Sequence, residues 1–216
     1  MQSVRVLGRR TRQYDRALMA LVFIVILGIL ASFTRAHDGA QPGVGGHQTS
    51  APKRYARAVV SYETPDVHLI DMTGALVPLT DVLNYQGPLL LQFIFTTCPT
   101  VCPALSGLFS ATLDRLESPA ARLRLISISI DPEHDTPERL RAYAQKLKAK
   151  PQWHFFTGRR EDIAAVQKAF DAYQNNKMQH EPLTYLRASP ATSWVRLDGF
   201  MSASDLVAEY RQLVSR

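Results

Sequence analysis

Segments with strand-like and helix-like patterns alternate along most of this chain. Four apolar runs rich in β-branched or aromatic residues predict strands at residues 89–95, 122–130, 153–157 and 191–197. Apolar residues that recur at helical spacing predict helices at residues 104–116, 137–147, 161–173 and 204–213. Strands that alternate with helices in this way predict one α/β domain, with a central mixed sheet and helices on both faces.

Shorter features complete this predicted domain. Residues 67–77 favour a hairpin that turns at residues 72–74, and residues 80–84 favour a short helix or turn. The polar residues 175–189 predict an irregular loop. The Asp-Gly pair at 198–199 is typical of a hairpin turn.

An acidic loop follows the second predicted strand and ends where a helix begins. Asp131 and His134 lie in this loop, and Asp135 or Thr136 can act as the helix N-cap ahead of Pro137. Capping and turn chemistry account for the acidic residues without a further role.

The two cysteines of the chain, Cys98 and Cys102, are four positions apart, at the turn between the 89–95 strand and the 104–116 helix. Unpaired N–H groups and the helix dipole favour a thiolate at such a turn. If both sulfurs lie on one helical face they can form a disulfide, and when reduced they are soft ligands for Cu(I). The alternative is an inert structural disulfide or two buried apolar side chains. The strand-turn-helix context and the flanking Pro99 and Pro103 favour a reactive site.

The positive charge of the chain is concentrated at its start. Of the formal net charge of +6, residues 1–16 carry +4, because they hold five arginines and one aspartate. The remaining +2 gives no electrostatic footprint for nucleic acid. With 46% hydrophobic residues, the composition is that of a globular protein and excludes wholesale disorder.

An uncharged apolar segment, residues 17–33, follows the basic residues. It would span roughly 25 Å as a helix, the short end of what crosses a bilayer. A cleavable signal peptide is the alternative, with a weak cleavage site at residues 34–36, but its apolar core is usually only about 7–15 residues long. The basic flank predicts a cytoplasmic N-terminus and an exported folded domain, where disulfides persist.

These observations divide the chain into four predicted parts. Residues 1–16 are a basic cytoplasmic tail and residues 17–34 a single-pass transmembrane anchor. Residues 35–58, rich in glycine and proline, are a flexible linker, and residues 59–216 are the folded domain on the periplasmic or extracytoplasmic side.

Three motifs in this order resemble the Sco/SenC family of membrane-anchored, copper-handling assembly factors. They are FTTCPTVCP at 95–103, ISIDPEHDTPE at 128–138 and WHFFTG at 153–158. The resemblance covers roughly residues 62–216 and implies a thioredoxin-like fold behind an N-terminal anchor. It also implies a copper-receiving or disulfide-bearing client, expected to be a respiratory oxidase subunit.

In this family the two cysteines and a later histidine hold copper, so the resemblance implies Cys98 and Cys102 as two ligands. The family histidine lies about eleven residues before the glycine of the last hairpin, and counting back from Gly199 gives Ala188. His180 is the alternative third ligand, with Met178 two positions away, because an imidazole nitrogen and a thioether sulfur both suit Cu(I).

Pro190 favours a second interpretation of the site. The residues from Pro190 to Gly199 are similar to those that follow the cis-proline of thioredoxin-like oxidoreductases. Only about 5–6% of X–Pro bonds in folded proteins are cis, and they are found in tight turns. If Pro190 were cis and faced Cys98, the site would resemble a dithiol-disulfide exchanger.

Two mechanisms and one non-catalytic alternative follow for an assembly factor of a copper site. In the first, Cys98 and Cys102 bind Cu(I) with His180 and pass it on. In the second, the protein is a thioredoxin-type thiol-disulfide oxidoreductase that binds no copper, and Cys98 is the attacking thiolate. The third is a scaffold with a fixed disulfide.

Overall fold

The computed structural model describes residues 54–116 and 122–215, and the described strands form one mixed, eight-stranded sheet. Its strands are ordered β1-β8-β7-β4-β5-β6-β2-β3. The neighbours β4–β5 and β5–β6 are parallel and the other pairs antiparallel. The bounds are β1 Ala56–Val60, β2 His68–Asp71, β3 Leu76–Pro78, β4 Leu89–Ile94, β5 Arg124–Ser129, β6 Trp153–Gly158, β7 Leu183–Arg187 and β8 Trp194–Asp198.

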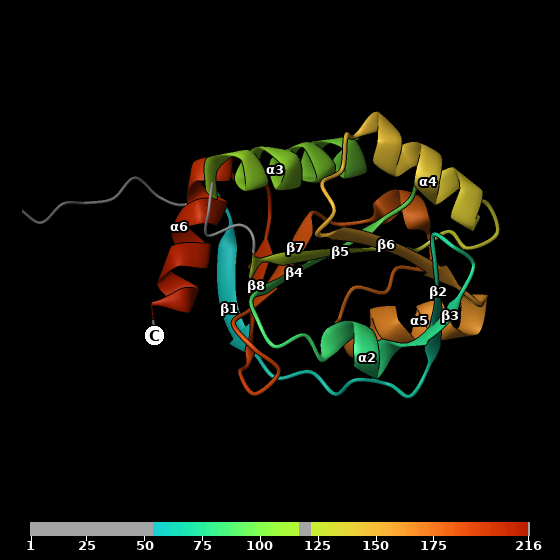
Figure 1. Cartoon of the computed structure of the whole chain (residues 1–216), viewed down its shortest axis with the longest axis horizontal. Helices are drawn as coiled ribbons and strands as arrows, with labels where there is room; N and C mark the ends of the chain where they lie inside the picture. The colour runs from blue at the N-terminus through green and yellow to red at the C-terminus, as the bar shows by residue number, and fades with distance from the viewer. Residues whose placement is uncertain (1–53, 117–121, 216) are drawn as a thin grey trace, which may run out of the picture. The chain divides into compact units, whose positions relative to one another are not determined.

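Helices cover both faces of this sheet (Figure 1). One apolar cluster joins one face to α3, α4 and α6, and a second joins the other face to α2 and α5. The bounds are α2 Leu79–Leu83, α3 Val101–Leu116, α4 Pro137–Lys146, α5 Arg160–Ala169 and α6 Ala203–Val214, with a 3₁₀ turn η2 at Lys177–Gln179. The predicted mixed sheet with helices on both faces is confirmed.

Strand β4 is the centre of the fold because both of its faces are buried. Its side chains alternate between the two clusters, with Leu90 and Ile94 under α3 and Leu91 and Phe93 under α5 and α2. A strand covered on both faces reads as a continuous apolar run, which is why the sequence predicted it correctly.

The chain between Lys177 and Gly199 differs from the prediction. Residues 183–187, expected within an irregular loop, form β7, which pairs with both β4 and β8. The turn of the last hairpin is therefore residues 188–193. The prediction of a hairpin turn at 198–199 is wrong, because Asp198 ends β8 and Gly199 leads toward α6.

The described part of the chain begins next to Gly199, the residue that follows β8. Gly199 has a φ of +118°, and a Cβ at this position would lie 3.0 Å from the carbonyl oxygen of Arg54. The N–H of Gly199 donates to the carbonyl of Pro182 at 3.0 Å. Gly199 therefore lies against both Arg54 and Pro182.

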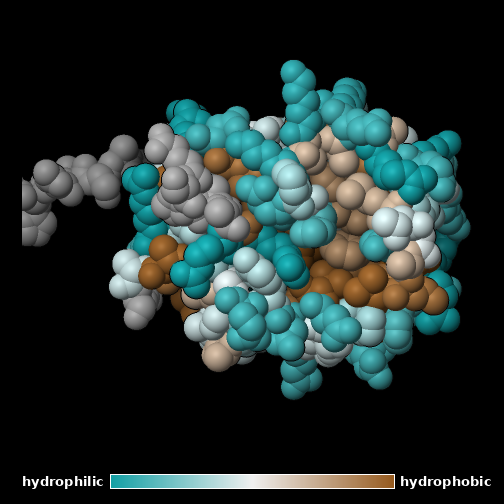
Figure 2. Space-filling view, viewed as in Figure 1, coloured by the Kyte–Doolittle hydropathy of each residue, from teal (hydrophilic) through white to brown (hydrophobic). Residues whose placement is uncertain are grey.

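The predicted tail and anchor, and residues 35–53 of the predicted linker, lie outside the described residues. The predicted end of the linker at residue 58 is wrong, because residues 56–58 belong to β1, which pairs with β8. None of the helices within 54–116 and 122–215 combines the length and the apolar character that crossing a membrane requires. The space-filling view shows mostly hydrophilic side chains, with an apolar band between the two helix layers (Figure 2).

Candidate functional site

The cysteine turn leaves the carboxyl end of β4 and leads into the first turn of α3. Cys102 is the second residue of this helix, whereas Cys98 lies ahead of it. The two cysteines therefore do not lie on one helical face, the arrangement on which the sequence-based disulfide prediction depended. Instead, the backbone N–H of Cys102 donates to the sulfur of Cys98 at 3.4 Å. The first N–H groups of a helix have no partner within the helix, and the Cys98 sulfur supplies one.

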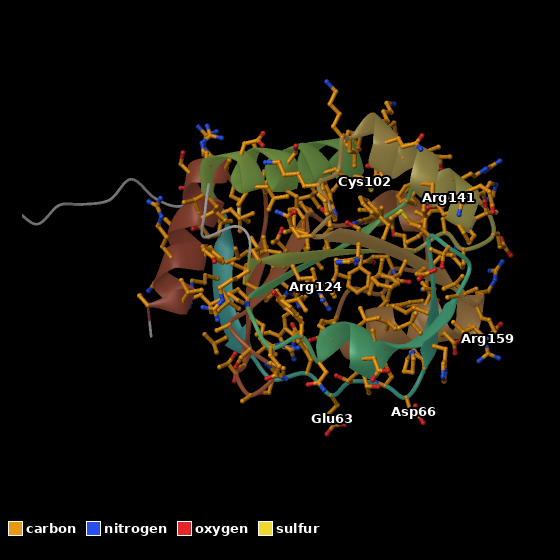
Figure 3. All side chains as sticks on the ribbon, viewed as in Figure 1. Glu63, Asp66, Cys102, Arg124, Arg141 and Arg159 are labelled. Atoms are coloured by element: carbon orange, nitrogen blue, oxygen red, sulfur yellow. The ribbon has the colours of Figure 1, made fainter. Side chains whose placement is uncertain are left out.

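The second sulfur lies deeper. The Cys102 sulfur accepts the backbone N–H of Phe95 at 3.4 Å, and Cys102 is 0% exposed, whereas Cys98 is 9% exposed. Both cysteines are free thiols in this structure. Figure 3 places Cys102 at the end of α3 that adjoins α4. Both cysteines are buried, and Cys98 is the more exposed of the two.

The two thiols also differ in acidity. Burial raises the pKa of the Cys98 thiol, but hydrogen bonds from the backbone of Cys102 and Thr100 outweigh it, so the pKa lies below its ordinary value. Burial raises the pKa of Cys102 far above its ordinary value, and the Phe95 N–H opposes this only in part. Cys98 is thus the thiol that ionises first.

A buried carboxylate fixes the start of the cysteine turn. Asp135 is 0% exposed and accepts the backbone N–H of Thr96 at 3.0 Å and the Thr96 hydroxyl at 2.5 Å. The Ser129 hydroxyl donates to the same carboxylate at 2.6 Å. Of the two N-cap residues that the sequence offered, Thr136 is the cap, because its hydroxyl accepts the N–H of Arg139 at 3.4 Å.

A second acidic residue holds the loop that carries His180. Asp131, 6% exposed, pairs with the Lys177 ammonium at 2.6 Å, and Lys177 also lies 5.6 Å from the ring centroid of Phe95. The His134 imidazole is 3.2 Å from the other oxygen of Asp131. The acidic loop thus contacts both the cysteine turn and the loop ahead of β7.

His180 lies at the same end of β4 as the cysteine turn. Its Nε2 is 3.0 Å from the carbonyl oxygen of Phe93, and its ring centroid is 6.5 Å from that of Phe95. A carbonyl only accepts, so Nε2 carries the hydrogen, and Nδ1 of the neutral ring keeps the lone pair. Burial lowers the pKa of this imidazole, which favours the neutral, ligating form.

A metal-binding histidine usually donates its other N–H to a backbone carbonyl or carboxylate, and His180 has this arrangement. Within residues 54–116 and 122–215, no three His, Cys, Asp or Glu side chains are grouped as a metal site. Met178 is 59% exposed. The structure brings Cys98 and Cys102 together and holds His180 at the same end of β4. The role of His180 as the third ligand stays a prediction.

Pro190 and Ala188 lie elsewhere. Arg187, which ends β7, pairs with Leu89 at the start of β4, so the turn after it is at the opposite end of that strand from Cys98. Pro190 lines a cavity with Thr80 of α2 and does not meet the cysteines. The count from Gly199 to Ala188 also fails, because the hairpin turn it assumed does not exist.

Two residues that hold the site were missed as site residues by sequence reasoning. Lys177 was not singled out, and Asp135 was considered only for capping and turn chemistry. Their partners are 46 and 39 positions away, which no local pattern reports. The only sequence signal was the acidic 131–138 block itself.

Comparison with known proteins gives one family match. The model of the SCO1/SenC family matches residues 62–215. Protein SenC of Rhodobacter capsulatus is 33% identical over 124 residues, which are 57% of this chain and 54% of that protein. The chain spans about half the length of the curated relatives it matches.

Two solved structures have the same fold. Copper-bound ScoI of Bradyrhizobium japonicum is 25% identical, with a TM-score of 0.55 over 68% of this chain and 96% of that one. BsSco, described as a member of the Sco family of cytochrome c oxidase assembly proteins with a disulfide switch, is 24% identical, with a TM-score of 0.61 over 73% and 96%. These overlaps confirm the predicted thioredoxin-like fold.

Proposed function

This chain belongs to the SCO1/SenC family, and from that premise we propose that it is an assembly factor that takes Cu(I) as cargo and delivers it to a copper site of a respiratory oxidase. Cys98 and Cys102 are the two sulfur ligands in this proposal, and His180 is the third ligand. Soft thiolates with one imidazole suit Cu(I).

The observation that carries this proposal is the position of His180. Its Nε2–H is held by the Phe93 carbonyl at 3.0 Å, and Phe93 is two residues before Phe95, whose N–H binds the Cys102 sulfur. The short segment from Phe93 to Phe95, at the end of β4, therefore connects the imidazole of His180 to the sulfur pair. The ion pair between Lys177 and Asp131, at 2.6 Å, restrains the same loop.

In the delivery mechanism, Cys98 makes the first contact with cargo because it is the more exposed and more acidic thiol. Cys102 loses its proton as the second sulfur binds, since a metal ligand must be the thiolate. The His180 loop then supplies Nδ1. A partner that offers more sulfur or nitrogen ligands takes the cargo from this sparsely coordinated site.

A second candidate function is thiol-disulfide exchange without copper, and the acidity difference between the two thiols favours it. The Cys98 thiolate attacks one sulfur of a partner disulfide and forms a mixed disulfide, while the other partner sulfur leaves as a thiolate. That thiolate takes the Cys102 proton. The Cys102 thiolate then attacks the Cys98 sulfur, which forms the Cys98–Cys102 disulfide and releases the second partner sulfur as a thiolate.

The proposed location is outside the cytoplasm, with residues 17–34 as a single-pass anchor. The basic residues 1–16 and the uncharged segment after them support this topology. A protease that reaches residues 59–216 from outside intact cells, and not the first sixteen residues, is the expected result. Protection of the folded domain on the cytoplasmic side would contradict it.

Titration of the reduced full chain with Cu(I) against a colorimetric Cu(I) chelator tests the function. We expect one Cu(I) per chain, lost in Cys98→Ser and Cys102→Ser and weakened roughly 10–100-fold in His180→Ala. His154→Ala is the matched control, because His154 lies in β6 and should leave the affinity unchanged. No uptake of Cu(I), together with rapid reduction of a protein disulfide, would favour the exchange function.

A further inference from the structure

The guanidinium of Arg187 is a buried cation at the end of β7. Arg187 is 7% exposed, and its Cζ lies 4.6 Å from the centroid of the Trp194 ring. Its Nη2 donates to the carbonyl of Leu83, the last residue of α2. Its Nε, by contrast, is enclosed without a hydrogen-bond partner. Arginine presents its N–H groups as a planar fork, and part of this fork is therefore unused.

This buried charge also has no acidic partner. Within residues 54–116 and 122–215, no Asp or Glu oxygen lies within 4.0 Å of Arg187. Asp198, at the end of the adjacent strand β8, is engaged by Arg196 at 2.8 Å. Burial lowers the pKa of Arg187, but an arginine keeps its charge in a protein. Because buried charges in proteins are normally paired, this one favours an anion supplied from outside the chain.

A cavity of about 250 Å³ borders this guanidinium, and hydroxyl groups line it. They come from Ser61 and Tyr62, which follow β1, and from Thr192 and Ser193, in the turn ahead of β8. The antiparallel pairing of β1 with β8 brings these two segments together (Figure 1). No Asp or Glu is among the described residues that line this Arg187 cavity.

Several of these hydroxyl groups are available as donors. The Tyr62 hydroxyl is enclosed without a hydrogen-bond partner. The hydroxyl oxygens of Ser61 and Ser193 lie 3.3 Å apart, so one hydrogen serves that contact and the other is left over. The Thr192 hydroxyl, in contrast, already donates to the carbonyl of Ser189 at 2.9 Å. An unpaired buried donor costs free energy, and an acceptor in the cavity would remove that cost.

The size of the cavity limits what it can hold. Its volume of about 250 Å³ lies below the roughly 300–1,000 Å³ of sites for drug-sized ligands, which favours a small ion. A guanidinium binds phosphate oxygens through parallel N–H donors, and the remaining oxygens can accept from hydroxyl groups. A second cavity borders Arg187 beside Thr80, but the exposed carboxylate of Asp81 also lines it and disfavours an anion there.

We propose that the Arg187 cavity binds a small oxyanion of the phosphate type. The Arg187 guanidinium supplies the positive charge, and the Tyr62 and Ser193 hydroxyls donate to oxygens of the ion. This site is separate from the cysteine pair, because Arg187 pairs with Leu89 at the start of β4, whereas Cys98 follows the end of that strand. The inference therefore does not depend on the proposed copper delivery.

Titration of the reduced full chain with sodium phosphate at constant ionic strength tests the proposal. Calorimetry should show one phosphate per chain. At a concentration roughly tenfold above the Kd, the midpoint of thermal unfolding should rise by about 3–5 °C. The amide NMR signals of Tyr62 and Ser193 should shift in the same titration. Phosphate also stabilises proteins by exclusion from their surface, and the rise that persists in Arg187→Met measures that part.

Three variants separate a site from a structural arginine. Arg187→Met removes the guanidinium and should weaken phosphate binding by more than about tenfold. Tyr62→Phe and Ser193→Ala each remove one hydroxyl, leave the contacts of Arg187 in place, and should weaken binding roughly 2–10-fold. Thr80→Val is the matched control, because its hydroxyl lines the second cavity and should not affect the affinity.

Each outcome decides the matter. One-to-one binding that is lost in Arg187→Met supports the inference, and if that variant does not fold, weakened binding in Tyr62→Phe and Ser193→Ala supports it instead. No saturable binding by the wild type overturns it, as does equal binding by the wild type, Tyr62→Phe and Ser193→Ala. Dimethyl phosphate tests the source of the ion, because it imitates the phosphodiester of a lipid headgroup. If it binds more tightly than inorganic phosphate, the free ion is overturned in favour of a headgroup.

Discussion

The backbone N–H of Cys102 donates to the sulfur of Cys98 at 3.4 Å, and this contact is one of the causes that make the two thiols of the pair chemically unequal. It stabilises a thiolate at Cys98, while the Cys102 sulfur stays enclosed beneath the turn. Cys98 is therefore the thiol expected to react first, and Cys102 the thiol expected to react after it.

This inequality predicts different alkylation rates. At pH 7 Cys98 should react with iodoacetamide at least about tenfold faster than Cys102, because it is more exposed and its lowered pKa gives more thiolate. The measurement is mass spectrometry of alkylated peptides over time, with Cys102→Ser and Cys98→Ser as the two single-thiol references. In Cys102→Ser, the reaction should reach half its maximal rate below the ordinary cysteine pKa of about 8.5. Equal rates at the two positions would contradict the geometry.

Two half-buried histidines predict how stability depends on pH. Burial lowers the pKa of both His180 and His154, and Arg124 lowers that of His154 further. Below the ordinary value of about 6.5, the unfolded chain binds protons that the folded chain does not, so the free energy of unfolding falls as pH decreases. The stabilisation is complete above about 6.5 and is lost toward the lower, folded pKa.

Urea unfolding between pH 7.5 and 5.5 measures this effect. His180→Gln and His154→Gln should each reduce the slope of stability against pH, by at most about 1.4 kcal/mol per pH unit. His68→Gln is the control, since His68 is exposed at the start of β2. An unchanged slope in His180→Gln would show that the imidazole of wild-type His180 takes up a proton as readily in the folded state as in the unfolded state.

Two lysine–aspartate pairs with the same 2.6 Å distance predict different costs. Lys177→Met leaves Asp131 buried with only the His134 contact, so we expect a loss of about 1–3 kcal/mol in the free energy of unfolding. Lys150→Met breaks an exposed pair with Asp114 and should change stability by less than about 1 kcal/mol. Denaturant unfolding at pH 7 compares the two, and equal losses would argue against a restraining role for Lys177.

A polar side chain in the core predicts a tolerated substitution. Gln92 of β4 is 0% exposed and donates to the Ser127 hydroxyl at 2.9 Å, but its side-chain oxygen has no hydrogen-bond partner. Gln92→Met removes this unpaired oxygen at similar volume and should change stability by less than about 1.5 kcal/mol. The neighbouring Leu91→Ala should cost about 2–5 kcal/mol. Thermal unfolding of both variants provides the comparison.

The central strand and the cysteine turn were predictable because their signals are local. Residues 89–94 form an unbroken apolar run, and Cys98 and Cys102 follow it directly. Strand β7 was missed because Thr184 and Arg187 are polar although they are buried. The Arg187 guanidinium donates to the carbonyl of Leu83 and lies 4.6 Å from the ring centroid of Trp194. These contacts depend on the fold and leave no periodic pattern.

The missed strand also misdirected the search for a third ligand. With β7 unrecognised, Gly199 was taken as the hairpin glycine, and the count from it led to Ala188 instead of His180. The contact between His180 and Phe93 joins residues 87 positions apart, which only the sheet brings together. Composition and spacing indicated the sulfur chemistry and offered His180 as a candidate ligand, whereas the position of its imidazole beside β4 depends on the pairing of β7 with β4.

The packing of Arg54 against Gly199, next to Pro182, has a consequence for how the domain is presented. The polypeptide that precedes the fold joins it beside the loop that carries His180. If residues 17–34 are held in a bilayer as proposed, the tether attaches near the loop that carries His180. The flexible linker predicted between the anchor and the domain would leave this end free to turn toward a client embedded in the same lipid layer.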